Sequence, residues 1–347
     1  MPAWEHITSE PRLLSWIKGY KITFSATPTQ SSIPNNRPFS YKEELALKKI
    51  IPELLSTGAI TRCKPLPDQF ISPIFLAPKP DGNFRLILNL KSLNKFIPTE
   101  HFKSEDYRVA SKLITPSCFM AKLDLKNAYY LLAVHPLHRR FLRFYFNDKL
   151  FEFTCLPFGL ASAPFVFTKI MRPVISLLRS KGFKSVNYLD DFLLLGPSER
   201  ACVRNVMATC AVLFSLGFLF SAQKCRFPPS TCCEFLGFEF NSVSMRMSLP
   251  ANKRSALARL INKMAKQRSC TIRQYAQFLG SLAAACPAIT YSRLYTKKFE
   301  RDKYLALLRA KGDFNAIMQL PPRESEFSWW RTIFSREIPP FSPLPLA

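Results

Sequence analysis

Residues 186–195 read Val-Asn-Tyr-Leu-Asp-Asp-Phe-Leu-Leu-Leu, and this stretch decides the fold. Two apolar strand patterns, residues 186–188 and 192–195, flank the acidic pair Asp190 and Asp191. One interpretation is an ordinary hairpin turn, because aspartate side chains bond to nearby backbone in turns. The flanking strands, however, are too apolar for an edge that faces water. Two adjacent carboxylates beside a buried sheet repel each other, and a divalent cation would remove that cost.

A third carboxylate belongs to the same pattern. Residues 119–125 form a short apolar strand pattern that ends at Asp124. The order strand, helix, hairpin, helix over residues 119–217 matches a split βαβ sheet with two helices on one face, in which the strand of Asp124 can lie beside the hairpin of Asp190. Converging carboxylates favour Mg²⁺ or Mn²⁺, because hard cations take oxygen ligands. Two such ions, about 3.5–4 Å apart, can hold an in-line phosphoryl displacement, so the pattern predicts nucleotidyl transfer.

The charge of the chain indicates a polyanionic partner. Its 347 residues contain 49 Lys and Arg against 24 Asp and Glu, which gives a net charge of +25. Fifteen of these cations and only two acids lie in residues 245–311, where we expect a groove for a phosphate backbone; a solvated helical face is the alternative. Apolar side chains interleave with this charge, namely Tyr275, Phe278, Leu279, Leu282, Tyr291, Leu294, Tyr295 and Phe299. A hydrophobic content of 48% excludes a disordered basic tail.

The cysteines, the histidines and the apolar segments of the chain bear on its cellular location and on whether it binds zinc. Ten cysteines show no CxxC spacing, and no apolar secretory segment opens the chain, so we expect reduced thiols in an intracellular protein of the cytoplasm or nucleus that is not secreted. No apolar run approaches the ~18 residues of a membrane span, and no amphipathic helix for a membrane surface is evident. The histidines and cysteines lack zinc spacing, so no zinc site is predicted.

Helix and strand patterns surround the acidic residues. Ser40 and Glu43 form a capping box for a helix that Gly58 ends, and residues 1–38 are expected to form an extended arm. Hairpins are expected at residues 71–90, around the turn 79–83, and at residues 142–153, and a helix is expected from Ala163. A further helix starts at Ser198, and we expect its inward face to hold Val203, Val206, Met207, Cys210 and Phe214.

Six motif blocks now carry a family resemblance. Tyr188-Leu189-Asp190-Asp191 resembles the YxDD signature of reverse transcriptases. The other blocks resemble the same family in the expected order and lie at residues 79–85 with 93–95, 123–129, 156–164, 216–225 and 235–238. Six ordered blocks make a chance agreement negligible, whereas the pair of aspartates alone would be weak evidence.

The C-terminal third resembles one subgroup. Its blocks at residues 271–280, 285–288, 293–295 and 328–330 are similar to DIRS-like (tyrosine-recombinase) retrotransposons, with gypsy-like LTR elements as the alternative. In such elements an RNase H domain would follow. The chain ends at Ala347, so we expect that domain to be absent or truncated.

The resemblance implies an α+β right-hand polymerase with fingers, a split βαβ palm sheet and a helical thumb. The expected divisions are an N-terminal arm and capped helix at 1–58, fingers and palm at 59–241, a basic helical thumb at 242–311, and a Pro-rich connection or tail at 312–347. The implied activity is RNA-directed DNA polymerisation of dNTPs onto a primer 3′-OH along an RNA or DNA template. Protein partners are not indicated.

Residue roles also come from the resemblance. Asp124, Asp190 and Asp191 would be catalytic and, with the carbonyl of Leu125, would hold two Mg²⁺ or Mn²⁺ ions. The residues implied in nucleotide binding are Lys79, Arg85, Lys126, Asn127, Ala128, Tyr129, Phe158 and Lys224. Among these, Tyr129 would be the steric gate that excludes a ribose 2′-OH, and Lys224 would protonate the leaving pyrophosphate. The implied primer grip consists of Phe235, Leu236, Gly237 and Phe238.

Two other functions stay open at this point. The chain could be a catalytically silent nucleic-acid-binding remnant of a mobile element, in which the basic region survives without synthesis. It could also be an RNA-dependent RNA polymerase, although Tyr129 at the gate position and Tyr188 before the acidic pair argue against that. Relatives often carry Asp where this chain has Asn127, but the family uses backbone amides of that turn, so activity is still expected.

Overall fold

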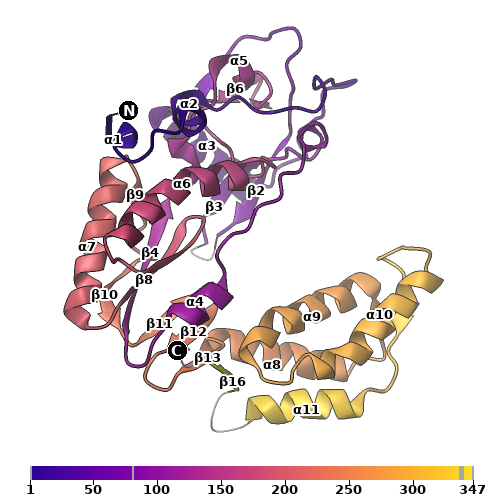
Figure 1. Ribbon diagram of the computed structural model, residues 1–347. Coiled ribbons are helices and arrows are strands. Elements are labelled where there is room, and N and C mark those ends of the chain that lie inside the picture. The colour runs from indigo at the N-terminus through magenta and orange to yellow at the C-terminus, as the bar shows by residue number, and fades with distance from the viewer. Residues whose placement is uncertain (1, 80–81, 336–339, 346–347) are drawn as a thin grey trace. The chain divides into compact units, whose positions relative to one another are not determined.

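The computed structural model describes residues 2–79, 82–335 and 340–345, which belong to two compact units (Figure 1). The first unit comprises residues 1–104, 123–192 and 205–225, and the second comprises residues 105–122, 193–204 and 226–347. Pro80 and Asp81, in the predicted turn, and residues 336–339 and 346–347, in the predicted tail, lie outside the described residues.

The central sheet has the strand order β10-β4-β8-β7, and β9 pairs with the end of β4. These strands are β4 (Phe119–Lys126), β7 (Ser185–Tyr188), β8 (Asp191–Gly196), β9 (Leu219–Phe220) and β10 (Arg226–Ser230). The division between the units passes through β4 and β8. Five of the six residues of β8 are buried, as the apolar pattern predicted. The predicted neighbourhood of β4 and β8 is therefore confirmed.

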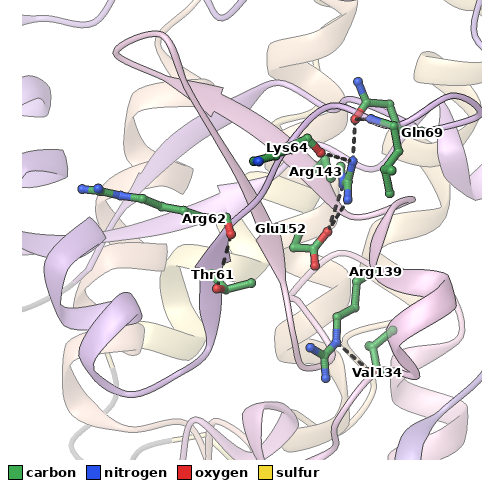
Figure 2. A network of polar contacts seen from close by, with 9 residues as sticks. Thr61, Arg62, Lys64, Gln69, Val134, Arg139, Arg143 and Glu152 are labelled. Atoms are coloured by element: carbon green, nitrogen blue, oxygen red, sulfur yellow. Dashed lines mark hydrogen bonds and ion pairs between the residues drawn. The ribbon is translucent and has the colours of Figure 1, made fainter.

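Two further sheets lie in the first unit. The hairpin β2 (Ile74–Pro78) and β3 (Phe84–Leu88) is a two-stranded sheet, and β1 (Ile60–Arg62), β6 (Lys149–Phe153) and β5 (Arg143–Phe146) form the other in that order. Figure 2 shows the buried Arg143, whose guanidinium donates to Glu152 at 2.7 and 2.9 Å, to the Gln69 side chain at 2.7 Å and to the Lys64 carbonyl at 3.1 Å. A buried charge needs such partners. Through Lys64 and Gln69, Arg143 also holds the loop that follows β1 against the β5–β6 hairpin.

The N-terminal region is more structured than predicted. The helices α1 (Pro2–Glu5) and α2 (Pro11–Gly19) precede the extended part, so only residues 20–38 are extended. The capping box is confirmed at the start of α3 (Tyr41–Ser56): Ser40 Oγ accepts from the Glu43 N–H at 3.4 Å, and the Glu43 carboxylate accepts from the Ser40 N–H at 2.9 Å. The remaining helical elements of this unit are η1 (Leu93–Phe96), η2 (Ala128–Leu131), α5 (Pro136–Arg139) and α6 (Ala163–Ser180).

The predicted inward face of α7 (Glu199–Ser215) is wrong in part. Val206 is buried, but Met207 is 66% exposed, Phe214 is 68% exposed and Val203 is 38% exposed. The buried positions are instead Cys202, Asn205, Val206, Thr209 and Leu213. Asn205 donates to the Lys184 carbonyl at 2.8 Å and accepts from the Thr209 hydroxyl at 3.1 Å, so two polar residues fill the inward face because their hydrogen bonds are satisfied there.

The second unit contains a sheet and a helical part. The sheet order is β11-β12-β13-β16, with β11 (Cys232–Phe235), β12 (Phe238–Asn241), β13 (Arg246–Ser248) and β16 (Phe341–Pro343). The helical part comprises α8 (Ala251–Ala265), α9 (Ile272–Ala285), η3 (Cys286–Ala288), η4 (Leu294–Thr296), α10 (Lys297–Arg309) and α11 (Glu324–Ser335), together with the strand pair β14 (Ser269–Thr271) and β15 (Ile317–Gln319). The short α4 (Tyr107–Leu113) also belongs to this unit.

Two expectations about this region need correction. Most of the apolar side chains that interleave with its charge form the core of the helical part, because Tyr275, Phe278 and Phe299 are at most 1% exposed. Of the eight interleaving side chains named above, Tyr291 and Leu294 are exposed, at 73% and 69%. Residues 312–347 are no simple tail either, since β15 pairs with β14, α11 packs against α8, and β16 pairs with β13. No helix within the described residues is both long and apolar enough to span a membrane.

Candidate active site

Three aspartates from distant parts of the chain gather in the first unit. Asp124 lies in β4 and is 4% exposed, Asp190 lies in the turn between β7 and β8, and Asp191 begins β8. The Leu125 N–H donates to the Asp190 carbonyl at 2.9 Å, which joins the two segments at this point. Because the N–H and C=O of one strand residue point to the same side, the Leu125 carbonyl also faces Asp190. The two segments that carry the four predicted metal ligands are therefore joined at Leu125 and Asp190.

The turn that presents Asp190 has an unusual backbone. Leu189 has φ = +54°, a left-handed conformation that costs a non-glycine residue about 1–2 kcal/mol. The Asn187 side chain donates to the Leu189 carbonyl at 2.8 Å and so stabilises this conformation. Sequence analysis did not identify Asn187, although an asparagine inside a strand pattern is a usable signal because strands are depleted in it.

The electrostatics of the site favour a bound cation. Burial raises the pKa of Asp124 above its ordinary value; the negative charges of Asp191 and Asp190 raise it further, while the positive charge of Lys224 opposes them. Burial and the charge of Asp191 likewise raise the pKa of Asp190, against the lowering effects of a backbone hydrogen bond, Lys224 and Arg85. Ionised carboxylates that are crowded in this way need added positive charge.

The donor set fits Mg²⁺ or Mn²⁺, which bind hard carboxylate and carbonyl oxygens. Among the described residues, no group of three His, Cys, Asp or Glu side chains is already arranged to hold a metal ion. Mg²⁺ commonly takes only one or two carboxylates and completes its shell with water and substrate phosphates. The aspartates are therefore suited to ions that enter with a substrate rather than to a closed protein cage.

One turn after β9 contacts Asp124 from three positions. The Ser221 N–H donates to the Asp124 carbonyl at 2.9 Å, and the Asp124 N–H donates to Cys225 Sγ at 3.3 Å. Lys224 Nζ forms an ion pair with Asp124 Oδ2 at 3.3 Å. Lys224 was predicted to belong to the site. Ser221 and Cys225 lie in the same motif block, 216–225, but were assigned no role, because they contact the backbone of Asp124 and the block does not reveal that contact.

An aromatic layer lies beside the acidic residues. The Tyr129 ring is 5.4 Å from the Phe158 ring and 5.3 Å from the Phe167 ring, measured between centroids. Burial and the nearby charge of Asp190 raise the pKa of Tyr129, so its hydroxyl stays protonated. The Arg85 guanidinium lies 4.7 Å from the centroid of Phe158, within cation–π range. Three predicted nucleotide-binding residues thus contact one another in series.

The segments that carry these residues have defined backbone conformations. Asn127 has φ = +50°, a left-handed conformation that asparagine tolerates better than most residues, and it turns the chain between exposed Lys126 and buried Ala128. Asn94 was not assigned a role from the sequence. Its side chain donates to the Gly159 carbonyl at 2.9 Å and accepts from the Ala161 N–H at 3.0 Å, and so holds the turn that follows Phe158.

The hairpin β2–β3 carries the two predicted phosphate ligands. Arg85 pairs with Ala77 in the register, and the Lys79 N–H donates to the Asn83 carbonyl at 2.7 Å. Backbone pairing of the two strands therefore continues as far as Lys79 and Asn83. No contact between Lys79 and the aspartates is present among the described interactions.

The predicted primer-grip residues form the β11–β12 hairpin of the second unit. Leu236 and Gly237 make a two-residue turn in which both φ values are positive, +48° and +78°, as type I′ hairpin turns require. Lys253 Nζ donates to the Gly237 carbonyl at 3.1 Å. Phe235 and Phe238 are buried, so they support the turn rather than expose an aromatic surface.

Comparison with known protein families now adds to this geometry. Residues 77–240 match the family model described as "Reverse transcriptase (RNA-dependent DNA polymerase)". The Transposon Tf2-3 polyprotein of Schizosaccharomyces pombe (strain 972 / ATCC 24843) is 26% identical over 235 residues, which cover 67% of this chain and 17% of the polyprotein. The Tf2-7 polyprotein of the same organism is 25% identical over the same length. The chain thus spans 17% of the length of these curated relatives.

Solved structures agree on the fold. A foamy viral protease-reverse transcriptase in complex with double-stranded DNA has a TM-score of 0.73 at 18% identity, over 91% of this chain and 52% of that chain. The complex of such an enzyme with an RNA/DNA hybrid has a TM-score of 0.66 at 18% identity, over 91% of this chain and 40% of that chain. The α+β right-hand polymerase fold predicted from the motif blocks is confirmed.

Proposed function

We propose, from the match of residues 77–240 to the reverse transcriptase family model, that the chain is an RNA-directed DNA polymerase of a retrotransposon. It would join dNTPs to a primer 3′-OH and release pyrophosphate. The observation that supports the proposal is the hydrogen bond between Leu125 and Asp190, which joins the two segments that carry Asp124, Asp190 and Asp191. The Tyr129–Phe158–Arg85 layer supports it further.

The aspartates and the Leu125 carbonyl would hold two Mg²⁺ or Mn²⁺ ions. When bound, these ions supply positive charge that activates the attacking hydroxyl and stabilises the leaving pyrophosphate. The ion pair of Lys224 with Asp124 keeps an ammonium group beside the site, from which it can donate a proton to the leaving group. Ser221 and Cys225 bond to the backbone of Asp124 and would thereby orient its carboxylate for metal binding.

The aromatic layer would select the nucleotide. Tyr129 is held between Phe158 and Phe167, so its ring cannot yield easily to a ribose 2′-OH. Arg85 presents a planar fork for triphosphate oxygens, and Lys79 adds a point charge from the same hairpin. The backbone amides of the turn formed by Lys126, Asn127 and Ala128 would receive the remaining phosphate oxygens.

The second unit would hold the nucleic acid. The hairpin turn at Leu236 and Gly237 is proposed to grip the primer, and the exposed cations of α8 and α9 would contact phosphates rather than bases. The foamy viral relatives were solved with double-stranded DNA and with an RNA/DNA hybrid, which supports a primer–template duplex as partner here. All ten cysteines are thiols, which supports a reducing compartment, the cytoplasm or nucleus.

We propose separately that the retrotransposon belongs to the DIRS-like subgroup. The blocks around Thr271, Cys286 and Trp329 favour a DIRS-like element over a gypsy-like one. A reading frame beside this chain that encodes a tyrosine recombinase would support that assignment, and an integrase of another type in that place would contradict it.

Primer extension on poly(rA)/oligo(dT) with Mg²⁺ tests the activity. We expect the wild-type protein to extend the primer with dTTP, and Asp190→Asn to lose at least about 10³-fold in rate, because a metal ligand charge worth several kcal/mol is removed. Asp148→Asn removes an equal charge from the exposed β5–β6 turn and should extend normally.

Two outcomes would contradict the proposal. If the wild-type protein binds the duplex without extending it, the chain is a silent nucleic-acid-binding remnant. If it extends with rUTP in preference to dTTP, it is an RNA polymerase and Tyr129 does not act as the gate.

A further inference from the structure

The extended N-terminal segment lies against strands and loops of the first unit. This arm segment (residues 20–38) precedes the part that matches the family model, which begins at residue 77. It starts at Tyr20, whose N–H donates to the Ala133 carbonyl at 2.8 Å and whose carbonyl accepts from the His135 N–H at 3.0 Å. The arm segment is thus anchored at its first residue, and two amide side chains anchor it further on.

Gln30 is the first of these side chains. Its Nε2 donates to the Ile71 carbonyl at 2.7 Å, and its Oε1 accepts from the Ile71 N–H at 2.9 Å. One side chain therefore satisfies both polar groups of a single backbone residue, as a neighbouring strand would do. Ile71 itself is 2% exposed, so without Gln30 these groups would need other partners in a buried place.

Asn36 is the second side chain, and it joins two sheets. Its Oδ1 accepts from the N–H of Ile74, the first residue of β2, at 2.8 Å. Its Nδ2 donates to the carbonyl of Tyr145 in β5 at 2.9 Å. The base of the β2–β3 hairpin is thereby tied to the three-stranded sheet β1-β6-β5 through one amide group.

These ties add to the burial of Leu76, Leu86 and Leu88 on the inward face of the hairpin. Among the described strands, β2 and β3 pair only with each other, so no neighbouring strand fixes their direction. At its base, Gln30 fixes residue 71, the Arg143 carbonyl accepts from the Ser72 N–H at 2.8 Å, and Asn36 fixes residue 74. From there to Lys79 the strand extends by about 17 Å. A small rotation at the base moves the far end by more, and catalytic geometry is lost with displacements of about 1 Å.

We propose that Gln30 and Asn36 are positioning residues that set the direction of the β2–β3 hairpin and hence the placement of Lys79 and Arg85 on the incoming triphosphate. The inference rests on the proposed function, because it assigns a purpose to the hairpin of the same site. It extends the nucleotide-binding machinery to residues that contact no substrate and lie outside the family match.

Steady-state primer extension with Asn36→Ala and Gln30→Ala tests the proposal. We expect KM for dNTP to rise about 5- to 20-fold while kcat changes less than about 2-fold, because the triphosphate loses well-placed cations while the aspartates keep their geometry. Asn35→Ala is the matched control, since Asn35 is the exposed neighbour of Asn36, and it should leave KM unchanged. Asn36→Asp keeps the bond from Ile74 but sets a carboxylate oxygen against the Tyr145 carbonyl, and two acceptors repel. We therefore expect its KM to be at least as high as that of Asn36→Ala.

Hydrogen exchange gives a readout that does not need activity. We expect amides of β2 and β3 to exchange at least about tenfold faster in Asn36→Ala than in Asn35→Ala, while amides of β4 exchange equally in both. Equal KM values and equal exchange in the two variants would overturn the inference, and so would a loss of kcat alone. If the wild-type protein does not extend a primer at all, the proposed function fails, whereas the exchange comparison still decides whether Asn36 holds the hairpin.

Discussion

Asp124 and Asp190 combine burial with negative neighbours, and this combination explains the need for bound cations. Each has a pKa raised above its ordinary value in the metal-free protein. Since the raised pKa belongs to the folded state, the unfavourable contribution of these groups is present at neutral pH and disappears as the pH falls below their ordinary values. A metal ion must therefore compete with protons that these carboxylates hold more readily than usual.

Metal binding should depend on pH for this reason. We expect the affinity for Mn²⁺ to fall as the pH is lowered into the range where these carboxylates take up protons, and the fall should begin above the ordinary carboxylate pKa. Titration calorimetry with Mn²⁺ measures the effect and the released protons. A fall that begins only at the ordinary carboxylate pKa would show that neither carboxylate has the raised pKa.

At the scale of elements, the helices of the second unit depend on a buried ion pair. Arg323, just before α11, donates to both carboxylate oxygens of Asp302 in α10 at 2.9 and 2.6 Å. The Tyr275 hydroxyl of α9 lies 3.5 Å from the same carboxylate. Asp302 is only 8% exposed, so its charge relies on Arg323 for compensation.

Arg323→Ala should destabilise this helical part by about 3 kcal/mol, because it leaves a buried carboxylate without its cation. Chemical denaturation, with hydrogen exchange of α10 to locate the effect, measures the change. Arg331→Ala is the matched control: its ion pair with Glu324 is exposed, with side-chain exposures of 37% and 79%, and its loss should cost about 0–1 kcal/mol. Equal costs in the two variants would contradict a structural role for the Asp302 pair.

Helix α7 shows that the spacing of apolar residues can predict the wrong buried face of a helix. Its apolar side chains lie on more than one face, so the sequence is compatible with two different inward faces. Burial of the hydrogen-bonded Asn205 and Thr209 decides between them and leaves Met207 and Phe214 exposed. The hydrogen bonds of these two polar side chains form only in the folded protein, so the pattern of apolar residues cannot predict which face is buried.

For the whole molecule, the surplus of positive charge sets the mode of binding. Arg259 and Lys263 are exposed on α8, and Lys266 is exposed at its C-cap. Their spacings of four and three residues place them along one stripe. Lys297 and Lys298 are exposed as well, but they form ion pairs with Glu300 and Glu326 at 3.0 and 2.6 Å. The stripe on α8 is the better candidate for phosphate contacts.

Salt dependence separates these two groups of cations. Each phosphate contact contributes about −0.9 to the slope of log K against log salt concentration. We expect the triple variant Arg259→Ala, Lys263→Ala, Lys266→Ala to lose about 2–3 from the magnitude of this slope for a primer–template duplex, measured by fluorescence anisotropy. The double variant Lys297→Ala, Lys298→Ala should lose less than about 1. The reverse order would place the duplex on α10.

Much of this protein could be read from the order of its residues. The right-hand fold predicted from six blocks is confirmed, and residues 77–240 match the reverse transcriptase family model. Capping boxes can be predicted as well because they are local, as at Ser40 with Glu43. The DIRS-like subgroup is not confirmed, and the roles of the individual site residues stay predictions.

Other features depend on contacts between residues far apart in the chain. Asn187, Cys225 and Asn94 support the site by bonding to backbone. Asn94 and Cys225 lie inside motif blocks, but the blocks do not say which backbone group each of them contacts. Gln30 and Asn36 bond to residues 38 to 109 positions away. Local patterns are set by neighbours along the chain and can be read in one dimension, whereas the partner of a buried amide or carboxylate is chosen only when the chain has folded around it.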